Sequence, residues 1–408
     1  MSAPPSPFPS IVRATGVQVA GHLASAIATL ASLGIAARAL GTEGFGRYTF
    51  FLAAFAVLAA LVDFGTMGAA IRRAAALPAH AAQAVGAAVR FRLLLAGAGV
   101  LAAGLLARAS GEPRPAAVAL AATPLLGHAL APLSIPLHVG LRFGPVAASR
   151  ALGSLSGLLF AGALAASGVR DPALFLLAAG TGSVVSNASA AVAARRGAER
   201  PDRPAPAGAP GGFLRESAAL GAGTLLRQVV ANLDSFFLRA SAGPSALARF
   251  NAPYRLLLAS CAVPGYACAA ALPALARAVP SDRRALEARL ARGLLALAAA
   301  GGTVAAVLAV PILRLLYGEV GGAAAPAMRL LVPAGLLAFP GNLFVVGLVA
   351  RNRSTALLKI SAAGLVLRAA LDAWLVPALA DRGAAIAAAA TEGFVLAACA
   401  AARGRGTR

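Results

Sequence analysis

The chain has 408 residues, of which 59% are hydrophobic and only 12% are charged, and its mean hydropathy is +0.80. These values exclude a water-soluble globular domain, which carries about twice as large a share of charged residues. The formal net charge of +22 would suit a nucleic-acid-binding protein, but no basic segment is interleaved with the aromatic side chains that stack on bases. We therefore expect a membrane protein with no nucleic-acid partner.

Apolar runs long enough to cross a hydrocarbon core of about 30 Å recur along the whole chain. They predict an all-α polytopic membrane protein with about twelve transmembrane helices, at residues 11–37, 47–70, 84–107, 115–138, 146–166, 172–194, 216–240, 250–276, 286–310, 324–348, 355–378 and 383–402. Residues 1–10 are rich in proline and predict a disordered N-terminal tail, and residues 403–408 form a basic C-terminal tail.

Two short segments in opposite halves of the chain are similar to each other, Leu40–Tyr48 and Ala242–Phe250. A register of 202 residues pairs Gly41 with Gly243 and Tyr48 with Phe250, and a register of 207 residues pairs Gly111 with Gly318. Duplicated runs of apolar helices are typical of membrane transporters, with the substrate site between the halves. We expect the two copies to form tight turns and to anchor an aromatic side chain at the membrane interface.

A segment rich in proline and glycine at residues 195–215 predicts a cytoplasmic linker between two lobes. The N-lobe would cover residues 11–194 and the C-lobe residues 216–402. Each lobe has an even number of spans, so the lobes have the same orientation and a pseudo-twofold axis along the membrane normal relates them.

Basic residues concentrate in the termini and in the loops after every second span. They include Arg72, Arg73, Arg90 and Arg92, and the basic residues of 195–215 and 277–292. This asymmetry predicts a cytoplasmic membrane protein with both termini in the cytoplasm. Only Arg227 and Arg368 are expected well inside spans, and Asp63 is expected to pair with Arg72 or Arg73.

No motif of an enzyme or of a cofactor site is present. Cys261, Cys268 and Cys399 lie in apolar spans without metal-ligand spacing, and so predict neither a disulfide nor a metal site. The loops carry no nucleotide-binding glycine motif and no nucleophile with a base. We expect a protein that is not an enzyme, without cofactors, whose energy comes from a substrate gradient, an ion or the membrane potential.

Polar side chains at membrane depth mark the candidate functional residues, because an ionisable group there costs at least about 2.5 to 3.5 kcal/mol. The span at 216–240 carries Arg227, Asn232 and Asp234. A separation of seven residues would place Arg227 and Asp234 on one helical face about 10 Å apart, as in a cavity lining. Alternatively, Asp234 neutralises a neighbouring arginine in the lobe core. His22, the ionisable residue in the middle of the first span, either lines the cavity or is packed.

The last two spans carry candidates for ion or charge coupling. Arg368 and Asp372 are four residues apart, so they can pair along one helix. Glu392 has no basic residue nearby in the sequence. It could therefore carry a proton, carry a cation, or pair with Arg368 in space.

Several segments in order resemble the polysaccharide (O-antigen-type) flippases of the multidrug/oligosaccharidyl-lipid/polysaccharide exporter superfamily. They are Leu40–Tyr48, Asp63–Arg72, Asn232–Asp234, Ala252–Arg255, Ala271–Ala276, Leu316–Glu319 and Arg368–Glu392. The resemblance implies a V-shaped, two-lobe protein that moves a lipid-linked oligosaccharide across the cytoplasmic membrane by alternating access. It also implies membrane lipids, a polysaccharide polymerase and glycosyltransferases as partners.

The resemblance also suggests roles for single residues. In the related lipid II flippases a sodium ion lies between helices, and the similar positions here are Asp234, Arg368, Asp372 and Thr391. Where those proteins have a neutral residue this chain has Arg368, whose guanidinium could replace the ion, so sodium and proton both stay open as coupling ions. Arg255 resembles a cavity arginine that receives the pyrophosphate of the lipid carrier; the alternative is an arginine that snorkels to lipid headgroups.

Two other functions remain open. A multidrug/cation antiporter of the same superfamily would need an anionic, aromatic-lined cavity, whereas only 5% of the residues are aromatic. A membrane scaffold in envelope glycan assembly would not need the internal polar groups.

Overall fold

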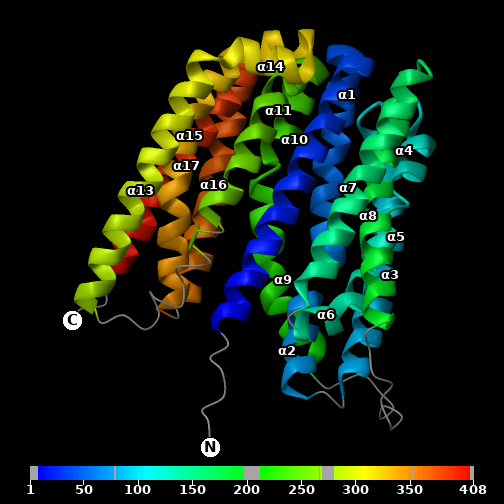
Figure 1. The fold of residues 1–408 in the computed structure, drawn as a ribbon. Coiled ribbons are helices and arrows are strands. Elements are labelled where there is room, and N and C mark those ends of the chain that lie inside the picture. The colour runs from blue at the N-terminus through cyan, green and yellow to red at the C-terminus, as the bar shows by residue number, and fades with distance from the viewer. Residues whose placement is uncertain are drawn as a thin grey trace, which may run out of the picture. The chain divides into compact units, whose positions relative to one another are not determined.

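A computed structural model describes residues 8–77, 80–140, 142–196, 212–265, 267–268, 280–351 and 353–404, and every regular element in this part of the chain is a helix (Figure 1). Nine helical runs among these residues are long and apolar enough to cross a membrane. The predicted all-α polytopic membrane protein is thereby confirmed, while the total of twelve spans stays a prediction. The first run, Ala20–Ala76, covers most of the first predicted span and all of the second.

The first half of the chain contains both long and broken helices. In order they are α1 (Phe8–Asp63), α2 (Thr66–Ala76), α3 (Ala81–Ala109), α4 (Pro115–Ala121), α5 (Leu125–His128), the 3-10 helix η2 (Ala131–Ser134), α6 (Ile135–Val139), α7 (Phe143–Ala166) and α8 (Pro172–Arg196). The predicted span at 115–138 is divided into four pieces because prolines interrupt its backbone hydrogen bonds. Since α1 begins at Phe8, residues 8–10 of the predicted tail are helical, and residues 1–7 lie outside the described part.

The second half contains α9 (Phe213–Val230), α10 (Leu233–Ser241), α11 (Gly243–Ser260), α13 (Pro280–Val307), α14 (Ala309–Tyr317), α15 (Glu319–Ala350), α16 (Ser354–Leu379) and α17 (Asp381–Gly404). The predicted continuous helix at 216–240 is interrupted after Val230. Residues 269–279, which complete the predicted span at 250–276 and include Ala271–Ala276, lie outside the described residues, as do 405–408 of the C-terminal tail.

The chain forms two compact units whose boundaries differ from those of the predicted lobes. The first contains Met1–Ala39 and Phe51–Gln228, and the second contains Leu40–Phe50 and Val229–Arg408. The turn of α1 therefore belongs with the second half of the chain, while α9 belongs with the first. Only the ends of the predicted 195–215 linker are described, because residues 197–211 lie outside the described part.

The backbone supports the internal repeat. Gly41 and Gly243 both have a left-handed φ, of 67° and 78°, and Gly111 and Gly318 do too, with 70° and 64°. Glycine tolerates this conformation because it lacks a Cβ. The same unusual angle at both members of each pair is the result expected of a duplicated chain.

The aromatic side chains of the repeated turns have a different role from the predicted one. Tyr48 is 2% exposed and Phe250 is 0% exposed, so the prediction that they anchor at the membrane interface is wrong. Phe45 packs between Tyr48 and Tyr317, with ring centroids 6.0 and 5.9 Å away, and Phe250 stacks on Tyr254 at 4.9 Å. These rings form part of the core of the second unit.

Candidate functional site

A buried ion pair joins α10 to α16 inside the second unit. The guanidinium of Arg368 donates from Nε to Oδ1 of Asp234 at 2.8 Å and from Nη2 to Oδ2 at 2.6 Å. Arg368 is 3% exposed and Asp234 is 0% exposed. Two parallel charge-assisted hydrogen bonds of this kind fix the orientation of both groups. Asp234 therefore neutralises an arginine, but one from a distant segment of the chain.

A second carboxylate lies beside this pair. Oδ2 of Asp372 is 3.5 Å from Nε of Arg368, and neither oxygen of this fully buried side chain has a hydrogen-bond partner among the described residues. The predicted pairing of Arg368 with Asp372 is thus the weaker of two contacts. One guanidinium faces two carboxylates, which leaves a formal excess of negative charge in a desolvated place.

Helix α17 supplies the remaining coupling candidates. Thr391 is buried, and its hydroxyl donates to the carbonyl of Ala387 at 2.8 Å. Glu392 is half-buried and within electrostatic range of Arg368. The structure therefore brings Asp234, Arg368, Asp372, Thr391 and Glu392 to one region of the second unit, which we call the charge cluster. The sequence separates Asp234 from the other four residues by more than a hundred positions.

The guanidinium of Arg368 lies between the carboxylates of Asp234 and Asp372. Both oxygens of Asp234 already accept hydrogen bonds from Arg368. A cation placed there would be repelled by the guanidinium at close range.

A second arginine lies nearby among tyrosines. Arg255 on α11 is within electrostatic range of Tyr48, Tyr254 and Tyr317. Its Nε is buried without a hydrogen-bond partner among the described residues, and so is the hydroxyl of Tyr317. No carboxylate of the described residues forms an ion pair with this guanidinium. We call these four residues the Arg255 cluster.

Tyr254 connects the two clusters. It follows Pro253 in α11, stacks on Phe250, and lies within electrostatic range of Arg255, Arg368 and Glu392. A ligand that changes the position of Arg255 would therefore act on a helix that also contacts the charge cluster. Sequence analysis considered Tyr48 only as an interface anchor and did not single out Tyr254 or Tyr317. The signals for these two were membership of the segments Ala252–Arg255 and Leu316–Glu319.

Buried amides complete the polar groups of this region. Asn232 precedes α10 and is buried. Asn251, which the sequence did not indicate, donates from its amide nitrogen to the hydroxyl of Ser235 at 3.3 Å. These groups tie α10 to α11 beside the charge cluster.

Two predicted cavity residues lie in the first unit. Arg227 is exposed on α9, whereas Asp234 is buried on α10. The prediction of a shared helical face is wrong because the helix between them is broken at 231–232. His22 is half-buried on α1, within electrostatic range of Arg150. Neither belongs to the charge cluster or to the Arg255 cluster.

Arg92 is a buried arginine of α3, so the prediction that it is a charge of a cytoplasmic loop is wrong. It is 2% exposed, donates to Thr66 Oγ1 at 2.7 Å and to the His128 carbonyl at 3.0 Å, and pairs with Asp63. The predicted pairing of Asp63 with Arg72 or Arg73 is therefore wrong. Its position inside the apolar run at 84–107 was the available signal, but its proximity to Arg90 favoured a loop interpretation.

Arg72 and Arg73, the partners predicted for Asp63, bind a different carboxylate. Arg72 and Arg73 each contact Glu216 at 2.8 Å. Glu216 lies in the first turn of α9, so this contact attaches α9 to α2. It is consistent with the assignment of α9 to the first compact unit.

Comparisons with known proteins identify the family and the fold of the chain. A model of the family described as "Polysaccharide biosynthesis protein" matches residues 11–279. A comparison with curated protein sequences finds no significant match.

Solved structures with similar folds are membrane transporters of one superfamily. They include a MOP superfamily transporter from Pyrococcus furiosus (17% identity, TM-score 0.68, covering 97% of this chain and 95% of that one). The lipid II flippase MurJ in an inward closed conformation also matches (11% identity, TM-score 0.67, covering 95% and 87%). So does an inward-facing multidrug resistance MATE family transporter (15% identity, TM-score 0.64, covering 95% and 94%). The chain therefore belongs to the polysaccharide biosynthesis protein family and is a multi-pass membrane protein with the fold of the MOP superfamily transporters.

Proposed function

We propose that the protein is a flippase that moves a polyprenyl-pyrophosphate-linked oligosaccharide across the cytoplasmic membrane by alternating access, for surface polysaccharide biosynthesis. The observation that carries the proposal is Arg255. It is a guanidinium inside a membrane protein of a polysaccharide biosynthesis family, and no carboxylate of the described residues pairs with it. An unpaired interior cation is costly to maintain, which a site for an anionic ligand would explain.

The chemistry of the Arg255 cluster suits a pyrophosphate. Guanidinium stays charged at every physiological pH and binds phosphate oxygens through two parallel hydrogen bonds. Tyrosine hydroxyls can donate to the same oxygens. The buried hydroxyl of Tyr317, which lacks a partner among the described residues, would gain one when the ligand binds. Burial of Nε inside the protein argues against an arginine that only snorkels to lipid headgroups.

The proposal can be tested by complementation of a gene deletion. Deletion should trap lipid-linked sugar on the cytoplasmic face, and the wild-type gene should restore surface glycan. Arg255→Gln should fail to restore it at normal protein levels. Arg108→Gln, which changes an exposed arginine at the end of α3, is the matched control and should restore it fully.

The alternative is a multidrug/cation antiporter. One of the similar structures is that of a multidrug resistance transporter. Such a protein would collect cations in its cavity, for which the charge of Arg255 is unfavourable. Unchanged surface glycan together with new drug sensitivity in the deletion strain would support the antiporter and contradict the flippase.

For energy coupling we propose that Arg368 acts as a built-in cation, so that transport does not need sodium. The support is that Arg368 satisfies both oxygens of Asp234. The uncompensated carboxylate of Asp372 and the half-buried Glu392 remain available to take up a proton. Transport in reconstituted vesicles should be equal with and without a sodium gradient and should respond to a pH gradient. A strong sodium requirement would contradict this part of the proposal.

Topology and partners are parts of the same proposal. Both termini would lie in the cytoplasm, which reporter fusions at residues 1 and 408 would test. Neighbouring genes for glycosyltransferases and a polysaccharide polymerase would be expected. Their absence would weaken the assignment to polysaccharide export.

A further inference from the structure

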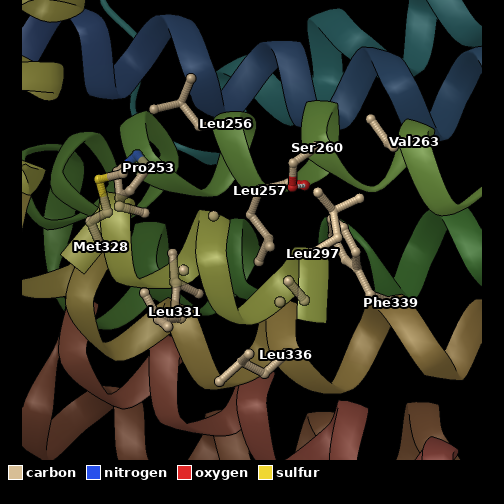
Figure 2. Close-up of a pocket in the computed structure, with 16 residues that line it drawn as sticks. Pro253, Leu256, Leu257, Ser260, Val263, Leu297, Met328, Leu331, Leu336 and Phe339 are labelled. Atoms are coloured by element: carbon tan, nitrogen blue, oxygen red, sulfur yellow. Dashed lines mark hydrogen bonds between the residues drawn. The ribbon is translucent and has the colours of Figure 1, made fainter. Parts of the chain in front are cut away.

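An apolar groove runs between α11, α13 and α15 of the second unit (Figure 2). Its volume is about 360 Å³. Figure 2 shows Pro253 and Met328 at one end and Val263 and Phe339 at the other. Along α15, the distance from Met328 to Phe339 corresponds to about 16 Å of helix, close to half of a hydrocarbon core of about 30 Å.

Small residues on α13 make this space. A Cβ at Gly301 would meet no atom within 4 Å, whereas one at Gly302 would lie 2.9 Å from Val332. Gly302 therefore allows α13 and α15 to pack closely. Gly301, which has no side chain, leaves a notch open beside that contact. Leu257, Leu331 and Leu336 supply larger apolar walls (Figure 2).

The lining cannot hold water well. The hydroxyl of Ser260 is the side-chain polar group that lines the groove, and it already donates to the carbonyl of Leu257 at 2.7 Å. Apolar cavities without free hydrogen-bonding groups stay dry and bind apolar ligands. α13 is a membrane span with exposed leucine and valine side chains, including Leu297 at the groove. The bilayer around α13 consists of hydrocarbon chains, and a hydrocarbon chain is therefore the expected occupant of the groove.

An arginine marks one end of the groove. Arg329 directly follows Met328, and its Nε donates to the carbonyl of Ala306 at 3.2 Å, next to the lining residue Ala305. Its side chain is exposed, and no carboxylate of the described residues pairs with it. The remaining guanidinium donors can bind a phosphate. A cation at one end of an apolar groove as long as one leaflet matches the two parts of a membrane lipid.

We propose that this groove is a binding site for a bilayer phospholipid, with one acyl chain between α11, α13 and α15 and the phosphate on Arg329. A phospholipid is favoured over a polyprenyl carrier because its second chain can remain in the bilayer along the exposed apolar face of α13, and because it surrounds this span at all times. The bound chain would lie against the face of α11 opposite Arg255, since residues 253, 256, 257 and 260 share one helical face and 255 does not.

The test is native mass spectrometry of the full-length protein in detergent, after washing and after titration with phosphatidylglycerol or with a polyprenyl phosphate. The wild-type protein should retain one phospholipid. Gly301→Leu places a side chain in the groove and should lower phosphatidylglycerol affinity about tenfold or more, the loss expected when a few buried methylenes are displaced. Gly293→Leu, at an exposed position of the same helix where a Cβ meets nothing within 4 Å, should not.

A second pair of variants tests the phosphate contact. Arg329→Gln should weaken phosphatidylglycerol binding, whereas Arg292→Gln should not, although Arg292 is also exposed and also donates to a backbone carbonyl at 3.2 Å. Ala305→Leu is the alternative filling variant if Gly301→Leu fails to fold, as judged by size exclusion and thermal melting. Equal phospholipid retention in all folded variants would overturn the proposal, as would tighter binding of polyprenyl phosphate in the same groove.

Discussion

Asp234 and Arg368 lie 134 residues apart in the chain, yet two hydrogen bonds of 2.8 and 2.6 Å join them in the core of the second unit. The pair connects α10 with α16, and a second carboxylate, that of Asp372, lies next to it. The residues that stabilise this core are therefore also those proposed for energy coupling, and variants there should separate the two effects.

Arg368→Gln should destabilise the protein strongly. It leaves Asp234 and Asp372 buried without a counter-charge, and removal of one partner of a buried pair costs about 3–5 kcal/mol. Thermal melting in detergent measures the effect. The double variant Asp234→Asn with Arg368→Gln should recover part of the loss, because only one of the two uncompensated carboxylates, that of Asp372, then remains. Melting of the single variant at the wild-type temperature would contradict the structural role.

Asp372→Asn and Asp234→Asn form a matched pair with opposite expectations. Asp372 accepts no hydrogen bond from the described residues, so its replacement should leave stability unchanged or raise it by about 1 kcal/mol. Asp234→Asn removes the negative charge and one of the two oxygens that accept from Arg368, and should be clearly destabilising. If Asp372 carries the proton, its variant should fold normally yet lose the response of transport to a pH gradient. A normal response would move the proton site to Glu392.

Tyr317→Phe should raise stability and lower transport. The hydroxyl is buried without a hydrogen-bond partner among the described residues, and its removal relieves a desolvation cost of about 1–3 kcal/mol. The same change removes a donor to the proposed pyrophosphate. Thermal melting and vesicle flipping assays on one preparation measure both effects. A variant with unchanged transport would exclude the hydroxyl from the substrate site.

Gly46→Ala should be destabilising by about 1–3 kcal/mol. A Cβ at this position would lie 1.9 Å from the carbonyl oxygen of Pro244, so the first copy of the repeated turn packs directly on the backbone of the second copy. Gly97→Ala on α3 is the control, because a Cβ there meets nothing within 4 Å. Equal melting temperatures for the two variants would show that this close approach tolerates a methyl group.

Much of the fold could be predicted because the bilayer imposes simple requirements on the chain. A span must be apolar over its length, so hydropathy located most helices to within a few residues, as at 355–378 for α16 and 383–402 for α17. Interruptions were harder to predict. The break at 231–232 carries no proline or glycine, so composition gave no sign of it.

The candidate site was less predictable than the fold. Arg368, Asp372 and Asp234 could be selected because charges at membrane depth are rare. The ion pairs that they form could not be predicted. The i,i+4 spacing suggested that Arg368 pairs with Asp372, whereas the stronger contact of Arg368 is with Asp234. Asp63 shows the same limit, because the sequence offered Arg72 and Arg73 nearby and the structure pairs it with Arg92.

The sequence by itself determined the membrane environment, the helical class, the duplication and the short inventory of interior charges, because each depends on local composition or spacing. Only the tertiary structure decided which charge meets which, which arginine stays without a carboxylate partner among the described residues, and where the notch of Gly301 becomes a groove. Those outcomes depend on helices far apart in the chain packing together. In a medium that cannot solvate a charge, the nearest partner in space determines the role of a residue, and sequence distance does not.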